Sequence, residues 1–317
     1  MTDAPLTANS IADYFGFKSH WISTRPGEKI HYLDEGSRDA DAVIFVHGSA
    51  IGITAAANFY LNIRAAVDAG YRVIAPDLYG YGWTESAPDI VADIFNQSEQ
   101  IVRIMDELKI EKAFLIGNSL GGRISVRVAM EYPARIRGCV IIGAGGAVWK
   151  PAPRFVASYT KQEAPKSADR DTVLKAMFRL VDNPAMVSDK LVEFRTRMAS
   201  RPGEVERYRQ STASRATSAI ESQLDVEAAK QCPVPMLIVY GREDKVGPPE
   251  NALACAEAFP NADLVVFGHC GHWVMIERAD DFNALMMRFL QGQDRRMTSP
   301  PVRSQDLLSG SLSHAAT

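Results

Sequence analysis

Six short, almost wholly apolar runs limit the fold of this chain more than any other feature of its sequence. A strand that is apolar at every position must be covered on both faces, and a parallel sheet between two layers of helices provides that environment. Longer helical patterns separate most of the runs, and two further runs, 20–23 and 29–33, flank a turn and predict a hairpin. We therefore predict an α/β fold with a mostly parallel eight-stranded sheet and helices on both faces. The six runs are 42–46, 71–75, 113–116, 138–142, 236–240 and 263–267.

The charge of the chain excludes several classes of partner. Its 35 Lys and Arg against 38 Asp and Glu give a net charge of -3, which offers no electrostatic footprint for nucleic acid or an anionic membrane. No apolar run approaches the roughly 18 residues that span a bilayer, and the first residues lack a signal-peptide pattern. We expect a soluble cytoplasmic protein whose ligand is a small molecule. The sequence leaves a homo-oligomer open.

The cysteines suggest neither a metal site nor a disulfide scaffold. Cys139, Cys232, Cys255 and Cys270 stand far apart and lack the paired spacing of zinc ligands. We expect reduced, mostly structural thiols, and no metal.

The alternation of strand and helix patterns stops between residues 147 and 230, where the chain is polar and helical. In open α/β sheets ligands bind beyond the carboxyl ends of the strands, so we interpret this segment as an inserted helical cap over that edge. Residues 1–146 and 231–292 then form the two parts of the core domain. The aperiodic residues 293–317 are predicted to be a disordered tail.

The run 113–116 leads directly into Gly117-Asn118-Ser119-Leu120-Gly121-Gly122, and a helical pattern follows as far as Met130. This is the GxSxG spacing in a strand-to-helix context, which makes a sharp turn that exposes the serine. The glycines are required because neighbouring backbone passes close to the turn. We predict that Ser119 is a nucleophile rather than an incidental serine in a glycine-rich turn.

A serine hydroxyl is a weak nucleophile at neutral pH and needs a base together with an acid that orients the base. In this context the acid precedes the histidine along the chain. Glu243 and Asp244 follow the fifth run, and His269 and His272 follow the sixth, so the residues leave two choices for each role. His31 stands in no partner pattern.

Oxyanion stabilisation requires two backbone N–H groups aimed at the developing charge. One is expected from Leu120, directly after the nucleophile, and the other from Ser49 in the loop after the run 42–46. His47 opens that loop, but it precedes both acids in the chain, and we expect it to be structural.

Taken together, these segments resemble a known family, the α/β-hydrolases, over residues 28–292. The resemblance rests on HGSAIG, GNSLGG, GREDKV and CGHW in that order. Within the family, VIAPDLYGYG, FGHCGHW and Ile276-Glu277, with Asn118 before the serine, resemble the hydrolases that cleave carbon–carbon bonds in products of aromatic ring meta-cleavage. The resemblance implies the α/β-hydrolase fold and a Ser-His-Asp triad.

Carried over residue by residue, the resemblance makes Asp244 the acid and His272 the base. Glu243 and His269 become neighbours of the triad. His269 also departs from the family, which commonly has an arginine at that position.

The resemblance further implies a cap arginine that binds the carboxylate of the substrate. Arg195 stands at that position, with Arg197 as the alternative. The chain departs from the family's HGxGPG loop, with Ala50 and Ile51 in place of Gly-Pro. The further pocket positions that match are Asn118, Asn58 and Trp273.

The sequence thus favours hydrolysis of a carbon–carbon bond in a 2-hydroxy-6-oxo-dienoate, a meta-cleavage product of aromatic degradation, with no metal and no cofactor. The alternative is a carboxylesterase or lactonase that uses the same triad. A ligand receptor built on the hydrolase fold is a third hypothesis, from a different class, against which an intact triad argues. The substituent at the remote end of the substrate is left open.

Overall fold

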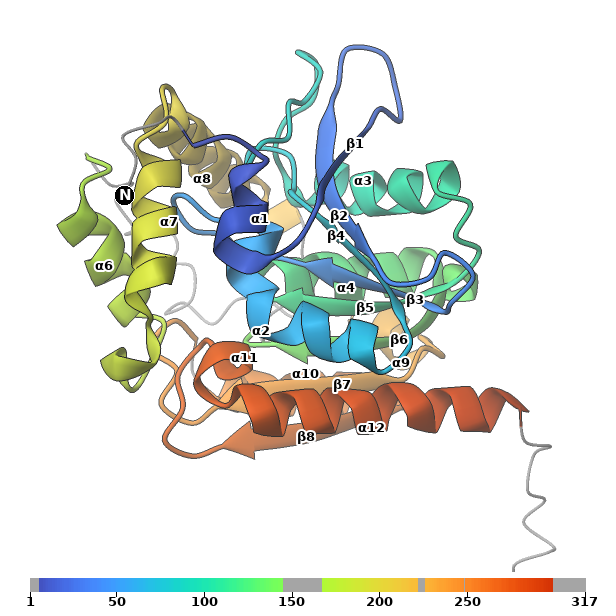
Figure 1. Cartoon of the computed structure of the whole chain (residues 1–317). Helices are drawn as coiled ribbons and strands as arrows, with labels where there is room; N and C mark the ends of the chain where they lie inside the picture. The colour runs from blue at the N-terminus through green and yellow to red at the C-terminus, as the bar shows by residue number, and fades with distance from the viewer. Residues whose placement is uncertain (1–5, 145–166, 222–225, 248, 299–317) are drawn as a thin grey trace, which may run out of the picture.

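The computed structural model describes residues 6–144, 167–221, 226–247 and 249–298. Its eight strands form a single sheet in the order β1-β2-β4-β3-β5-β6-β7-β8 (Figure 1). The strands are β1 (Ser19–Ile22), β2 (Ile30–Glu35), β3 (Ala42–Val46), β4 (Arg72–Pro76), β5 (Ala113–Asn118), β6 (Ile136–Ile142), β7 (Met236–Gly241) and β8 (Ala262–Phe267). The first two strands pair antiparallel, β2 joins β4 antiparallel, and the remaining pairs are parallel. The predicted mostly parallel eight-stranded sheet is confirmed.

Helices cover both faces of this sheet, as predicted. In chain order they are α1 (Ser10–Phe15), α2 (Ala55–Asp68), α3 (Ile94–Glu107), α4 (Leu120–Glu131), the 3-10 turn η1 (Pro133–Arg135), α6 (Arg170–Phe178), the 3-10 turn η2 (Pro184–Met186), α7 (Asp189–Ala199), α8 (Glu204–Glu221), α9 (Val226–Lys230), α10 (Glu250–Ala258), α11 (Val274–Glu277) and α12 (Ala279–Thr298). Figure 1 shows α3 and α4 on one face and α2, α11 and α12 on the other.

Alternate residues of the central strands point into two apolar cores. On β3, Ile44 and Val46 belong to the core shared with α3, α4 and α10, whereas Val43 and Phe45 belong to the core shared with α2, α11 and α12. Burying each such side chain fully stabilises the fold by about 1.5–3 kcal/mol. This two-sided burial explains why the strands are almost wholly apolar runs in the sequence.

Because β3, β5, β7 and β8 are parallel, the loops that follow them leave the sheet at the same edge. These four loops carry Ser49, Ser119, Asp244 and His272. The topology therefore gathers at one edge residues that are far apart in the sequence.

Between β6 and β7, every element that the structure describes is helical, from α6 to α9. In Figure 1, α6, α7 and α8 lie together on the side of the sheet toward which the parallel strands point. The packing of α7 against the loop after β3 is close, since a Cβ added at Gly52 would collide with the carbonyl oxygen of Arg195. The expected start of the inserted segment, residue 147, lies outside the described residues.

The C-terminal end of the chain differs from expectation. Residues 293–298, which we expected to belong to a disordered tail, form the last turns of α12. Extending an existing helix adds one hydrogen bond per residue without a new nucleation step, so a helix can continue into a largely polar stretch. The proposed tail residues 299–317 lie outside the described residues.

Two further expectations concern the whole chain. All four cysteines are buried and unpaired, as expected for reduced structural thiols, and burial raises the pKa of Cys255 and Cys270 to about 12. Within the described ranges, no helix combines the length and apolar character that crossing a membrane requires.

Candidate active site

Ser119 occupies the sharp turn between β5 and α4. Its backbone adopts φ 53° and ψ -113°, a positive φ that is costly for a residue with a Cβ. The turn is held by the hydrogen bond from Ser119 N to Ile142 O (2.8 Å). Glycine is obligatory around it, because a Cβ at Gly117 would collide with Gly121, and one at Gly121 would collide with Val46. The predicted strand, serine turn and helix are all present.

His272 and Asp244 form a buried pair on neighbouring loops. Nδ1 of His272 lies 2.7 Å from Oδ2 of Asp244, and the side chains are 3% and 0% exposed. The other carboxylate oxygen of Asp244 accepts from the amides of Val246 (2.7 Å) and Gly247 (3.1 Å). A carboxylate at Nδ1 favours the tautomer that leaves Nε2 free to accept a proton.

The serine turn and the histidine ring lie against the same short segment at the end of β6. Ser119 bonds to the carbonyl of Ile142, and a Cβ added to the next residue, Gly143, would stand 2.8 Å from Nδ1 of His272. The structure therefore brings Ser119, His272 and Asp244 together at the carboxyl edge of the sheet.

The alternative acid and base occupy different positions. Oε2 of Glu243 accepts from the amide of Cys270 (3.0 Å), and its other oxygen pairs with Arg242 (2.7 Å). His269 is exposed and adopts a positive φ of 53°. Of the two choices that the sequence left for each role, Asp244 and His272 are the pair in contact.

The loop after β3, residues 47–52, lies directly beside the serine turn; because the sequence predicts that it stabilises an oxyanion, it is called the oxyanion loop below. A Cβ added at Gly48 would stand 3.3 Å from the Cβ of Ser119. The amide of Gly48 donates to Oδ1 of Asn58 (2.8 Å), and Nδ1 of His47 donates to the carbonyl of Gly48 (2.7 Å). Ser49, the next residue, is partly exposed, and Leu120 begins α4, where the first N–H groups of a helix have no acceptor within it.

His47 is fully buried and holds this loop, in agreement with the structural role expected from its place in the chain. Its Nε2 accepts from the amide of Leu78 (3.0 Å) while Nδ1 donates, so the ring carries a single proton. Burial lowers its pKa below the ordinary value.

The two predicted pocket asparagines bind each other and the loops on either side of the nucleophile. Nδ2 of Asn58 lies 3.4 Å from Oδ1 of Asn118, whose own Nδ2 donates to Ile142 O (3.3 Å). Since Asn58 also accepts from Gly48, this pair ties the oxyanion loop to the turn that carries Ser119. Both side chains are buried.

Arg195 projects from α7 toward the oxyanion loop and is 1% exposed. Its Nη2 and Nε donate to the carbonyl of Ile51 (2.7 and 3.2 Å), and its Cζ lies 5.6 Å from the ring centroid of Trp273. Burial lowers the pKa of Arg195 to about 10, and among the described residues no carboxylate forms a salt bridge with it. Arg197, by contrast, contacts Tyr14 of α1 and Glu193 of its own helix.

Sequence reasoning missed two supporting side chains. The hydroxyl of Tyr81 donates to Oγ of Ser49 (2.8 Å) and accepts from Ser211 of α8 (3.1 Å), which links the inserted helices to the oxyanion loop. Glu277 accepts from the amides of Gly271 (2.6 Å), Asp182 (2.8 Å) and Asn183 (2.9 Å), and so joins the loop of His272 to the segment after α6. Both lie in segments that carried the family resemblance, which was the available signal.

Across the described parts of the chain, no cluster of three or more His, Cys, Asp or Glu is placed to hold a metal ion.

The chain is similar in sequence and in structure to known hydrolases. A family model described as the alpha/beta hydrolase fold matches residues 41–279. The 2-hydroxymuconate semialdehyde hydrolase of Pseudomonas sp. (strain CF600) is 33% identical over 80% of this chain and 87% of the relative. The 2-hydroxy-6-oxo-6-phenylhexa-2,4-dienoate hydrolase of Burkholderia cepacia is 32% identical over 83% and 91%. A solved mutant of the meta-cleavage product hydrolase from Pseudomonas fluorescens IP01, complexed with acetates, is 31% identical with a TM-score of 0.74 and covers 87% of this chain and 97% of that one.

Proposed function

Because the chain belongs to the α/β-hydrolase family, we propose that it uses Ser119, His272 and Asp244 to cleave a carbon–carbon bond in a 2-hydroxy-6-oxo-dienoate. The relatives at 31–33% identity bear the names of hydrolases for substrates of this kind. The observation that carries the proposal is the buried guanidinium of Arg195 beside the oxyanion loop, whose described partner is a neutral carbonyl. A substrate carboxylate supplies the negative charge that pairs with this guanidinium.

The helices α6, α7 and α8 form a cap over the carboxyl edge of the sheet in this proposal (Figure 1). Of these helices, α7 brings Arg195 to the site, and Ser211 reaches the oxyanion loop from α8 through Tyr81, whereas α9 lies against α10. A cap of this kind excludes water and holds the substrate in one orientation.

The chemistry follows from these positions. Arg195 binds the carboxylate, and the dienol of the substrate loses its hydroxyl proton and gains one at carbon, so that it becomes the isomeric ketone. Nε2 of His272 then accepts the hydroxyl proton of Ser119, and the serine oxygen attacks the remote carbonyl carbon. The amides of Ser49 and Leu120 stabilise the oxyanion that develops.

The carbon–carbon bond next to that carbonyl breaks as the oxyanion collapses. The electron pair leaves on the departing fragment as an enolate, which the earlier ketonisation makes stable enough to depart, and His272 returns the proton. Water then attacks the acyl-serine and releases a carboxylic acid, so the net reaction adds one water to the substrate. Asp244 holds the imidazole and stabilises its cation throughout.

Ester or lactone hydrolysis by the same triad is the second candidate. It is favoured by the two hydrogen bonds from Arg195 to the Ile51 carbonyl, which give the guanidinium a role inside the protein. An ester needs no ketonisation, because an alkoxide leaves directly.

A substrate panel distinguishes the two. Purified protein is mixed with ring-cleavage products that differ in the remote substituent, and loss of their yellow dienolate absorbance is followed beside p-nitrophenyl esters. Carbon–carbon hydrolysis predicts a kcat/KM at least about a hundredfold higher on one dienoate than on the esters, since about 3 kcal/mol separates a specific from a generic substrate. Ester turnover without any loss of dienolate absorbance would assign the second candidate.

A further inference from the structure

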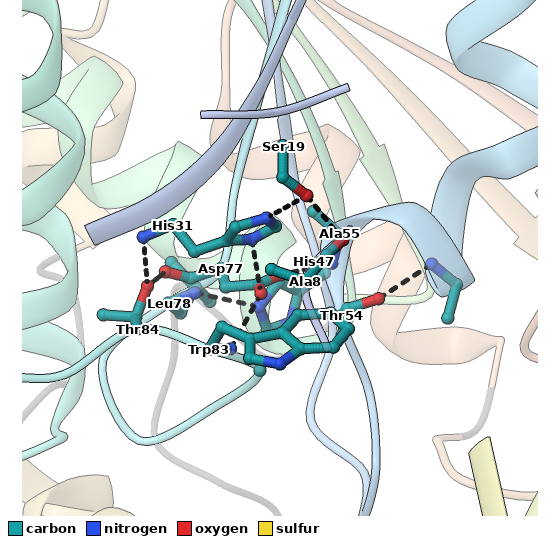
Figure 2. Close-up of polar contacts among 12 residues, drawn as sticks. Ala8, Ser19, His31, His47, Thr54, Ala55, Asp77, Leu78, Trp83 and Thr84 are labelled. Carbon is teal, nitrogen blue, oxygen red and sulfur yellow. Dashed lines mark hydrogen bonds and ion pairs between the residues drawn. The ribbon is translucent and has the colours of Figure 1, made fainter. Parts of the chain in front are cut away.

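A second Ser-His-Asp arrangement lies in the core, away from the candidate active site. His31 on β2 stands between Ser19 on β1 and Asp77, which directly follows β4 (Figure 2). Nε2 of His31 lies 2.9 Å from Oγ of Ser19, and Nδ1 lies 2.9 Å from Oδ2 of Asp77. His31 and Asp77 are each 1% exposed.

The hydrogen bonds show that this set does not work as a triad. The single hydroxyl proton of Ser19 is donated to the carbonyl of Ala8 (2.7 Å), so the short contact with His31 must be a donation from Nε2. Nδ1 must also donate, because a carboxylate only accepts. His31 therefore carries both ring protons and is a cation, which cannot act as a general base toward Ser19.

The surroundings of His31 fit a buried cation. Its ring lies 5.1 Å from that of Trp21 and 5.3 Å from that of Trp83, and indole rings attract cations. Its charge is matched by Asp77. Burial opposes ionisation of Asp77, but the charge and hydrogen bond of His31 outweigh it and hold the pKa of that carboxyl below its ordinary value.

Asp77 uses its remaining acceptor capacity on two backbone amides. Oδ1 accepts from Ala55, the first residue of α2 (2.8 Å), and Oδ2 accepts from Trp83 (3.1 Å) as well as from His31. The carboxylate accepts at the N-terminus of α2, where the first N–H groups have no acceptor within the helix; α2 is kinked at Phe59, after its first turn. A carboxylate is needed here because it offers two acceptor oxygens to three donors, and an amide offers one.

The contacts on both sides of Asp77 lead to the same residue of the oxyanion loop, Gly48. On one side, α2 continues from Ala55 to Asn58, whose side chain accepts from the Gly48 amide. On the other side, the residue after Asp77, Leu78, donates to His47, whose Nδ1 donates to the Gly48 carbonyl. The amide and the carbonyl of Gly48 are thus held by two routes that start at one carboxylate.

We propose that Asp77, paired with the cationic His31, is a positioning residue that sets the backbone of the oxyanion loop at Gly48 and Ser49. The inference rests on the proposed role of that loop at Ser119. Asp77 touches no substrate, and it acts through α2 and His47.

The experiment compares Asp77→Asn with Asp34→Asn. Asp34 is a matched control, because it forms a shielded ion pair with Arg72 through two hydrogen bonds (2.9 and 2.8 Å) on the same two strands, β2 and β4. Its described hydrogen bonds do not lead to the oxyanion loop. Both variants lose a buried charge, so both are expected to lose stability. Only Asp77→Asn is expected to lower kcat, by about ten- to a hundredfold, with KM changed less than about threefold, since an oxyanion contact acts in the transition state.

Equal kcat values for the two variants, or parallel changes in kcat and KM, would overturn the proposal. Should Asp77→Asn not fold, His31→Gln keeps the carboxylate and a neutral donor, and we expect a smaller loss of kcat at unchanged KM. Unchanged kcat in His31→Gln would then count against the pair.

Two measurements need no turnover and separate this inference from the proposed function. In the wild-type protein, nitrogen NMR is expected to show two protonated ring nitrogens for His31 and one for His47, and a neutral His31 would contradict the assignment. Hydrogen exchange at the Gly48 amide is expected to accelerate in Asp77→Asn and not in Asp34→Asn. If neither dienoates nor esters are hydrolysed while both results hold, the proposed function fails and the loop-positioning role stands.

Discussion

Asp244 and His272 are joined at 2.7 Å in an environment closed to solvent, whereas the adjacent carboxylate of Glu243 points to the backbone of Cys270. The orienting acid of the candidate triad is therefore defined by contact and not by order in the chain. We expect Asp244→Asn to lower kcat by about 10³- to 10⁴-fold, because the asparagine no longer fixes the histidine tautomer or stabilises its cation. Glu243→Gln is the control, with a loss below about threefold in the same assay. The reverse ranking would show that Glu243 is the acid.

Ser119 offers a test that separates chemistry from folding. Ser119→Ala and Ser119→Gly both remove the attacking oxygen and are expected to abolish turnover. They should differ in stability, because Ala retains the Cβ that makes φ 53° costly and Gly does not. We expect Ser119→Gly to be about 1 kcal/mol more stable than Ser119→Ala in urea titrations. Residual hydrolysis near the wild-type rate in either variant would remove Ser119 from the mechanism.

Arg195 distinguishes carbon–carbon hydrolysis from ester hydrolysis. If it binds the substrate carboxylate, Arg195→Gln should lower kcat/KM on dienoates by about ten- to a hundredfold, which corresponds to a charge-assisted contact of about 1.5–3 kcal/mol. Lysine should restore little of this, since a point charge does not reproduce the planar fork. Neutral p-nitrophenyl esters should be almost unaffected.

The matched control for Arg195 is Arg197→Gln, two residues along the same helix, where the guanidinium contacts Tyr14 and Glu193. It should change neither substrate class by more than about twofold. Equal losses of kcat/KM on both substrates in Arg195→Gln would mean that Arg195 supports the cap through its hydrogen bonds to Ile51 and does not bind the substrate carboxylate.

His47 gives a pH dependence of stability whose sign is fixed by its surroundings. Burial lowers the pKa of His47 in the folded protein, whereas in the unfolded chain the pKa is the ordinary value of about 6.5. Below that pH the unfolded chain therefore binds a proton at His47 that the folded protein does not bind. Its contribution to stability is complete above that pH and is lost as the pH falls toward the lowered pKa. Wild type should lose up to about 1.4 kcal/mol per pH unit more than His47→Gln over this window. Unfolding titrations at pH 7.5 and 5.5 check this, and identical pH slopes would contradict it.

Glu277 is expected to stabilise the loop that carries His272. Glu277→Gln leaves one acceptor oxygen for three backbone amides, so at least one buried N–H loses its partner, at a cost of about 1–3 kcal/mol. The control is Asp281→Asn in the first turn of α12, which breaks an exposed ion pair with Arg278. It should lower the free energy of unfolding by less than about 1 kcal/mol. Urea unfolding of the two variants provides the comparison, and equal losses would mean that the Glu277 contacts are not structural.

The features that could be predicted best from the sequence are the buried strands. Runs such as 42–46 and 236–240 coincide with β3 and β7 to within a residue, because a strand packed on both faces has no polar positions to blur its ends. The serine turn was equally readable, since steric crowding leaves only glycine at positions 117 and 121. Local chain geometry determines both features.

The sequence could not predict contacts made between distant segments. Nothing near His31 pointed to Asp77, which is 46 positions away, because their meeting depends on the antiparallel pairing of β2 with β4. The choice between Glu243 and Asp244 could not be made either, because these adjacent side chains leave the backbone in different directions and the sequence does not show which one faces His272. The end of α12 was misjudged for a different reason, since polar residues extend a helix as readily as they form a tail.

The four buried thiols make the protein a reporter of its own unfolding. A thiol whose pKa is raised by burial presents almost no thiolate at neutral pH, so a reagent such as a disulfide dye can modify it only after the surrounding core opens. Cys139 is buried on β6 in the core shared with α4, whereas Cys270 is buried beside His272 in the core shared with α12. Labelling rates at these two sites therefore time the opening of each layer separately, and a single cysteine added at the surface would react orders of magnitude faster than all four.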